Sequence, residues 1–145
     1  MIYRRIIAVI IDILIAGVAA IIVGLYLNSS IQNILFKTVL FYFLHTTLIL
    51  FLSKKYTFGE GIIKIRAVSI DSKDLQFTTL FLRNILFCFY LLLIAICWGR
   101  PFEFILFVLL FLSLNSIIFI KNNYHHPMTG FDFLFKSYYI SLKTT

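Results

Sequence analysis

The chain has 145 residues, of which 61% are hydrophobic and only 13% charged, and its formal net charge is +7. A soluble domain carries about 25% charged residues, so this composition excludes a water-soluble globule and predicts one membrane domain. The cations lie in the gaps between apolar segments and share no polar face. This distribution favours contact with anionic lipid over binding to nucleic acid. The sequence shows no internal repeat.

Four apolar segments approach the length of a transmembrane helix, which needs roughly 20 mostly apolar residues. A turn at residues 28–30 separates the first two, and a turn at residues 99–101 separates the last two, where Pro101 resists continuing a helix. We therefore predict an all-α membrane protein with about four transmembrane helices. The segments are residues 6–27, 31–52, 82–98 and 104–120.

The lysines and arginines predict the orientation of these segments. Eleven of the thirteen cations precede the first segment, lie between the second and third or at the very start of the third, or follow the fourth. Only Lys37 and Arg100 fall on the other side. Because cytoplasmic loops carry the excess of Lys and Arg, we expect both termini and the middle loop to be cytoplasmic. The first segment is too long for a cleaved signal peptide, and Asp12 interrupts it.

The stretch between the second and third segments, residues 53–82, is the only sizeable polar insertion. Residues 59–61 predict a turn, and the alternation at residues 63–66 predicts a short strand on the cytoplasmic membrane surface. Asp74 is expected to cap a helix that starts at Leu75, lies in the membrane interface and leads into the third segment.

Small residues recur at every fourth position of the first segment, on one ridge that also carries Asp12. Small side chains let two backbones approach closely, which is how membrane helices associate. We expect this ridge to pack against another helix, although a general abundance of alanine is the alternative explanation. The ridge consists of Ala8, Ala16, Ala20 and Gly24.

Asp12 lies about two turns inside the cytoplasmic end of the first segment. A carboxylate at this depth costs a few kcal/mol, so it should face the bundle and have a partner. Arg5 lies seven residues earlier, on nearly the same helix face. Two interpretations of Asp12 stay open: a structural anchor, or a carboxylate that titrates or binds an ion.

Other polar residues are expected at a similar depth. If the helices pack antiparallel, they form one polar layer in the inner third of the bundle, and the outer half stays apolar. A lone histidine within a membrane is more often a hydrogen-bonded packing residue than a functional group. This secondary polar layer consists of His45, Arg83, Asn84, Asn115 and Ser116.

Neither cofactor, metal nor enzyme chemistry is expected. Cys88 and Cys97 point to opposite sides of a helix and fit packing roles. His125 and His126 have no further ligands at metal-binding spacing. The chain lacks the serine-hydrolase and zinc-protease motifs, so an intramembrane enzyme is the weakest hypothesis.

Short motifs along nearly the whole chain resemble the RDD family of bacterial membrane proteins, named for one Arg and two Asp. Glu60 and Phe131 stand where that family usually has Lys and His. By position, the resemblance implies a functional trio of Arg5, Asp12 and Asp132 in one domain covering residues 1–145. The motifs are Arg5-x-x-Ala8-x-x-x-Asp12, Thr57-Phe58-Gly59 with the strand at residues 62–68, Arg83-Asn84, and Thr129-Gly130-Phe131-Asp132 followed by Ser137.

We expect this trio to form a charge cluster at the cytoplasmic face, in which Asp12 and Asp132 share the Arg5 guanidinium. The resemblance implies transport of an unidentified ligand, with cation–proton exchange as one possibility. A carboxylate and a histidine within the membrane fit a small transporter or transporter subunit of the cell membrane. Four short helices make a thin wall, which favours a homo-oligomer. The alternative is a non-transporting assembly, scaffold or protective partner of a larger complex.

Overall fold

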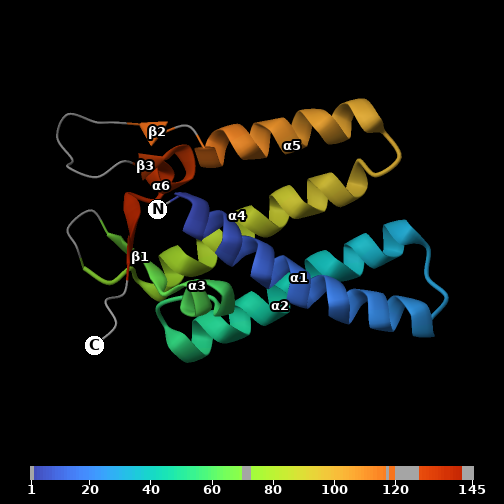
Figure 1. The fold of residues 1–145 in the computed structure, drawn as a ribbon, viewed down its shortest axis with the longest axis horizontal. Helices are drawn as coiled ribbons and strands as arrows, with labels where there is room; N and C mark the ends of the chain where they lie inside the picture. Colours follow the sequence, from blue (N-terminus) through green and yellow to red (C-terminus); the bar gives the residue numbers. More distant parts are fainter. Residues whose placement is uncertain (1, 70–72, 117, 120–127, 142–145) are drawn as a thin grey trace.

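The computed structural model describes residues 2–69, 73–116, 118–119 and 128–141 of the chain. Figure 1 shows two helical hairpins, joined at one end by short helices and strands. In chain order, the elements are α1 (Ile2–Tyr26), α2 (Ile31–Ser53), α3 (Phe58–Ile63), β1 (Ile65–Ser69), α4 (Phe77–Ile96), α5 (Pro101–Ser116), β2 (Ile118–Phe119), β3 (Met128–Thr129), α6 (Gly130–Leu134) and β4 (Ser137–Ser141).

Three described helices, α1, α2 and α4, are long and apolar enough to cross a membrane. Their outward faces carry large apolar side chains such as Leu14, Leu48 and Phe89, which are more than half exposed. So much exposed apolar surface requires an apolar surrounding. Helix α5 begins at Pro101, three residues earlier than expected, and ends at Ser116. With 16 residues it is shorter than a typical membrane span.

The insertion between α2 and α4 differs from the expected one. Residues 59–61 belong to a helix, because Thr57 and Glu60 form a reciprocal capping box that starts α3. The helix expected from Leu75 begins two residues later, at Phe77, and continues without a break to Ile96 as α4. Asp74 does not cap it, and is held instead by two cations from neighbouring elements, Lys55 at 3.1 Å and Arg66 at 2.8 Å.

The strand expected at residues 63–66 lies slightly later, as β1. It pairs antiparallel with β4 in a two-stranded sheet, with Ile65 opposite Ser141 and Ser69 opposite Ser137. The sequence did not predict β4 or this pairing. The short strands β2 and β3 form a second antiparallel pair. The protein is therefore mostly helical, with a small β component at one end of the bundle (Figure 1).

The two halves have a similar order of elements, except that β2 and β3 lie between α5 and α6. Both halves consist of a helical hairpin, a short helix capped by threonine, and a strand. Thr57 caps α3, Thr129 caps α6, and in each half the strand begins eight residues after that threonine. Ala67 and Tyr139, each ten residues after its threonine, lie opposite one another in the sheet. Paired strands with this register are related by an approximate two-fold axis through the sheet.

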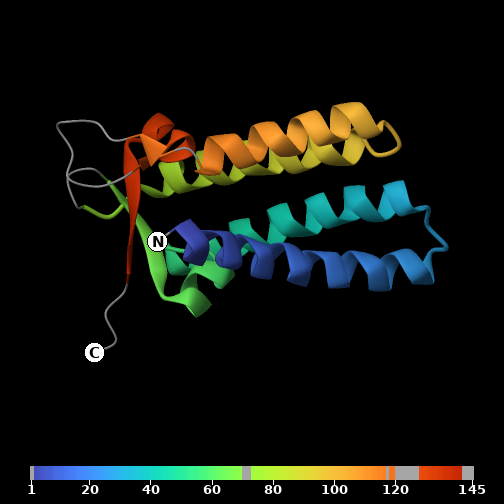
Figure 2. The same cartoon turned by 45° about the horizontal axis from the view of Figure 1, so that its top comes forward.

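Figure 2 shows the α1–α2 hairpin beside the α4–α5 hairpin, with the strands at one end. Helix α2 packs along α4, whereas α5 does not pack along α1 in the same way (Figure 2).

The small residues of the α1 ridge lie at helix contacts. Ala8, Ala16 and Ala20 are at most 1% exposed. Ala16 packs in a cluster with Tyr42 of α2 and with Phe87 and Cys88 of α4. At Gly24, an added Cβ would lie 2.6 Å from the Ile34 side chain, so the end of the first hairpin has no room for a larger residue.

Candidate functional site

Asp132 lies between two guanidinium groups at the end of the bundle that carries the strands. Arg5 Nη1 of α1 donates to Asp132 Oδ2 at 2.9 Å, and Arg83 Nη2 of α4 donates to Oδ1 at 3.3 Å. All three residues are at most 9% exposed. These ion pairs attach the tail of the chain to the first helix of each hairpin.

The short helix α6 explains how Asp132 is held in place. Thr129 is its N-cap, and the hydroxyl and backbone N–H of Thr129 both donate to Asp132 Oδ2. The hydroxyl in turn accepts from the Asp132 N–H and from Arg5 Nη1. Arg83 also donates to the Ser137 hydroxyl at the start of β4. Each charged group in this cluster is therefore fixed by several hydrogen bonds.

The second short helix, α3, holds Asp12. The Thr57 hydroxyl donates to Asp12 Oδ2 at 2.6 Å, and the Gly59 N–H donates to Oδ1 at 2.8 Å. An added Cβ on Gly59 would lie 2.0 Å from the Ala8 carbonyl oxygen, so the backbones of α3 and α1 are in direct contact. Only glycine permits this approach. It places the Thr57 hydroxyl and the Gly59 N–H against the carboxylate of Asp12, which is 1% exposed.

The expected sharing of Arg5 by Asp12 and Asp132 was therefore wrong. Both hydrogen-bonded oxygens of Asp12 receive neutral donors from α3, and the second cation on Asp132 is Arg83. The physical reason is distance along the helix. Seven residues separate Arg5 from Asp12 by about 10 Å of helix axis. Helix α3, in contrast, lies against Ala8, one turn from Asp12.

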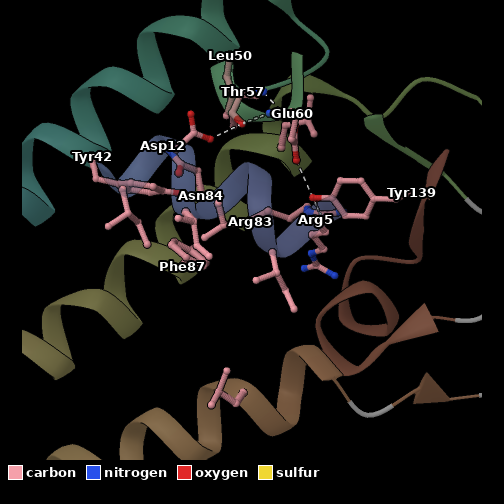
Figure 3. A pocket seen from close by; sticks show the side chains of 16 residues that line it. Arg5, Asp12, Tyr42, Leu50, Thr57, Glu60, Arg83, Asn84, Phe87 and Tyr139 are labelled. Atoms are coloured by element: carbon pink, nitrogen blue, oxygen red, sulfur yellow. Dashed lines mark hydrogen bonds between the residues drawn. The ribbon is translucent and has the colours of Figure 1, made fainter. Parts of the chain in front are cut away.

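Glu60 and Tyr139 connect the two parts of the site, as Figure 3 shows. The Tyr139 hydroxyl donates to Glu60 Oε1 at 2.7 Å and accepts from Arg83 Nη2 at 3.1 Å. The other Glu60 oxygen accepts from the Thr57 N–H at 3.0 Å. The Arg5 and Arg83 guanidinium carbons lie 4.9 Å and 5.3 Å from the Tyr139 ring centre. One network thus extends from the arginine cluster to the helix that holds Asp12.

The residues of the secondary polar layer make separate contacts and do not form one layer. Arg83 belongs to the cluster on Asp132. Asn84 binds α2, because its side-chain amide donates to Thr47 and accepts from Thr46. His45 lies edge-on to the Phe58 ring, and its buried Nδ1 has no hydrogen-bond partner among the described residues. The side chains of Asn115 and Ser116, and the pair His125 and His126, lie outside the described part of the structure.

A cavity of about 290 Å³ lies beside this network. Its polar end is formed by the charged and hydroxyl-bearing groups just described, and its other walls are apolar (Figure 3). The polar lining is Arg5, Asp12, Tyr42, Thr57, Glu60, Arg83, Asn84 and Tyr139. The apolar lining is Ile6, Val9, Ile10, Ile13, Leu50, Leu80, Phe87 and Leu112.

The charges at the polar end do not balance. Arg5 and Arg83 contribute two positive charges, and both pair with Asp132. Asp12 and Glu60 form no salt bridge with any residue that the structure describes. With all five groups ionised, the site carries a formal charge of −1. Burial raises the pKa of Glu60, while the hydrogen bond from Tyr139 and the charge of Arg83 oppose that rise.

We expect this raised pKa to make stability depend on pH. Above the ordinary glutamate pKa of about 4.3, the folded state retains the Glu60 proton that the unfolded chain loses. The free energy of unfolding therefore falls as pH rises from there to the native pKa. Arg83, Asp12, Tyr139 and the Thr57 N–H face this carboxyl group. Melting temperatures from pH 4 to pH 8 should fall more steeply for the wild type than for Glu60→Gln.

Glu103→Gln, in the first turn of α5, is the control for that measurement. It removes a carboxyl group that is not part of the network and should leave the wild-type pH dependence unchanged. Parallel curves for the wild type and Glu60→Gln would show that Glu60 does not titrate differently in the folded state.

The fold and the site together define a multi-pass membrane protein with a buried arginine–carboxylate network at one end of its helices. The model of the RDD family matches residues 1–136, and the chain belongs to the RDD family. Comparison with curated proteins and with solved structures gave no match. Membership agrees with a location in a cell membrane. The three residues singled out by the resemblance, Arg5, Asp12 and Asp132, all belong to the network around the cavity.

Proposed function

We propose that this RDD protein is a small transporter, or a transporter subunit, that takes an unidentified ligand or cation into the cavity. The cavity itself carries the proposal. Two carboxylates, the buried Asp12 and the partly buried Glu60, line it without a salt bridge among the described residues. An ionisable group at membrane depth is costly and is typical of a transport pathway. The chain acts as one domain and not as an enzyme.

We further place α5 as a fourth membrane crossing, with the network end of the bundle in the cytoplasm. A 16-residue helix is about 24 Å long, and a bilayer can thin to meet it. The hairpin turns at the opposite end carry little positive charge, whereas Arg4, Lys54, Lys55 and Lys64 lie near the network. This asymmetry supports cytoplasmic termini and contact of the network end with anionic lipid.

Two hairpins alone enclose little space, which supports a homo-oligomer or a larger membrane complex as the working unit. A non-transporting assembly, scaffold or protective partner is the second candidate. It is favoured by the hydrogen bonds to Asp12, since neutral donors from Thr57 and Gly59 already satisfy that carboxylate in a structural role.

Flux in proteoliposomes separates these candidates. We expect the wild type to move at least one cation from a panel of alkali and organic cations under an imposed pH gradient, and Asp12→Asn to lose about tenfold of that flux or more. An asparagine keeps hydrogen bonds to Thr57 and Gly59, so the variant should fold and reconstitute like the wild type. Wild-type flux no greater than that of empty liposomes would favour the non-transporting partner.

A further inference from the structure

The two hairpins pack closely against one another along α2 and α4, but not along α1 and α5. Helices α2 and α4 are joined by the Asn84 hydrogen bonds to Thr46 and Thr47. The rings of Tyr42 and Phe87 also meet there, with centres 5.2 Å apart. Helices α1 and α5, in contrast, lie apart (Figure 2).

The cavity lies where α1 and α5 are apart. Ile6 and Ile10 of α1 and Leu112 of α5 line it, and they are 38%, 48% and 48% exposed. Side chains that line a cavity and are also exposed on a lipid-facing surface mark an opening toward the bilayer. A ligand can therefore reach the carboxylates sideways, between α1 and α5.

The lining indicates what kind of ligand fits. A small inorganic cation requires about six oxygen ligands to replace its water, but most walls of this cavity are hydrocarbon. Asp12 and Glu60 form no salt bridge among the described residues, and their negative charges favour a positively charged ligand. The rings of Tyr42, Phe87 and Tyr139 also line the cavity, and aromatic faces attract cations, most strongly when water is excluded. Apolar walls with a single charged end match an apolar molecule that carries one positive charge.

We propose that the cavity binds a lipophilic organic cation that enters from the bilayer between α1 and α5. The proposal rests on the cavity of the proposed function and narrows its ligand class. Asp12 and Glu60 supply the counter-charge, while Ile6, Ile10 and Leu112 form the lateral entrance.

Equilibrium binding to purified protein in nanodiscs tests this directly. The probes are tetraphenylphosphonium and tetraphenylborate, which have nearly the same size and shape but opposite charges; protein-free nanodiscs correct for partition into lipid. We expect saturable binding of the cation only. Asp12→Asn combined with Glu60→Gln should weaken it about tenfold or more, a loss of about 1.4 kcal/mol.

The entrance has its own matched pair of variants. Ile10→Trp should obstruct the opening and weaken cation binding about tenfold. Ile7→Trp makes the same change at a residue of nearly equal exposure, 47%, that does not line the cavity, and should bind like the wild type. Size-exclusion elution confirms that each variant is folded.

Equal binding of both ions, or cation binding unaffected by both the carboxylate and the Ile10 variants, would overturn the proposal. Absence of tetraphenylphosphonium binding together with alkali-cation flux would refute this ligand class and leave the transport function intact. Specific cation binding without flux of any ion would support the ligand class and count against transport.

Discussion

Replacing Asp132 with leucine is expected to lower the free energy of unfolding by about 3–5 kcal/mol, the cost of leaving buried charges without a partner. Asp132 is the shared counter-ion of Arg5 and Arg83, and all three side chains are nearly inaccessible. Its removal leaves two buried guanidiniums close together. Chemical unfolding in detergent micelles, followed by circular dichroism, measures the loss.

Asp74→Leu is the matched control. Asp74 also pairs with two cations, Lys55 and Arg66, but its side chain is 49% exposed. Exposed ion pairs contribute about 0–1 kcal/mol, so this change should have a small effect. If Asp132→Leu and Asp74→Leu lowered the free energy of unfolding equally, burial of the Asp132 cluster would contribute nothing to stability.

Gly59→Ala is expected to prevent α3 from docking on α1. The added methyl group would meet the Ala8 carbonyl oxygen at 2.0 Å, and backbone atoms cannot move aside as the end of a flexible side chain can. Overpacking usually costs about 1–3 kcal/mol, and a clash with backbone lies at or above the upper end. Separation of the helices would also remove the Gly59 hydrogen bond to Asp12, so the yield of folded protein should fall severalfold.

Gly61→Ala, two residues later in the same helix, controls for helix propensity. Its Cβ would meet only the Tyr56 ring, at 3.1 Å, and a side chain can adjust by a few tenths of an ångström. A folded yield close to that of the wild type is expected. If Gly59→Ala gave the same yield as Gly61→Ala, the close contact between α3 and Ala8 would be wrong.

The long helices could be predicted because a bilayer imposes a length and a composition on whatever crosses it. The insertion was less predictable. The pattern Thr57-x-x-Glu60 is a capping-box signature and could have indicated α3, but the two glycines beside Glu60 favoured a turn. The pairing of β1 with β4 joins segments from opposite halves of the chain, and no local pattern encodes such a contact.

For the site, the sequence indicated several of the residues but not all of their contacts. A buried carboxylate in the first helix must have a partner, which correctly drew attention to Asp12, but its partner depended on where α3 docks. Arg5 and Asp132 were expected at the same membrane surface, and the structure brings them together. Tyr139 was missed because its contact with Glu60 exists only once the two halves meet. The functional roles of these residues stay predictions.

The proposed cytoplasmic position of the network end of the bundle is the claim on which the transport and lipid proposals depend, and it can be tested by labelling. Ser29→Cys and Lys73→Cys, each in a background where the buried Cys88 and Cys97 are replaced by alanine, are treated with a membrane-impermeant maleimide in intact cells. The account predicts that Cys at position 29 is labelled from outside, and that Cys at position 73 is labelled only after the membrane is permeabilised. Labelling at position 73 in intact cells would contradict it.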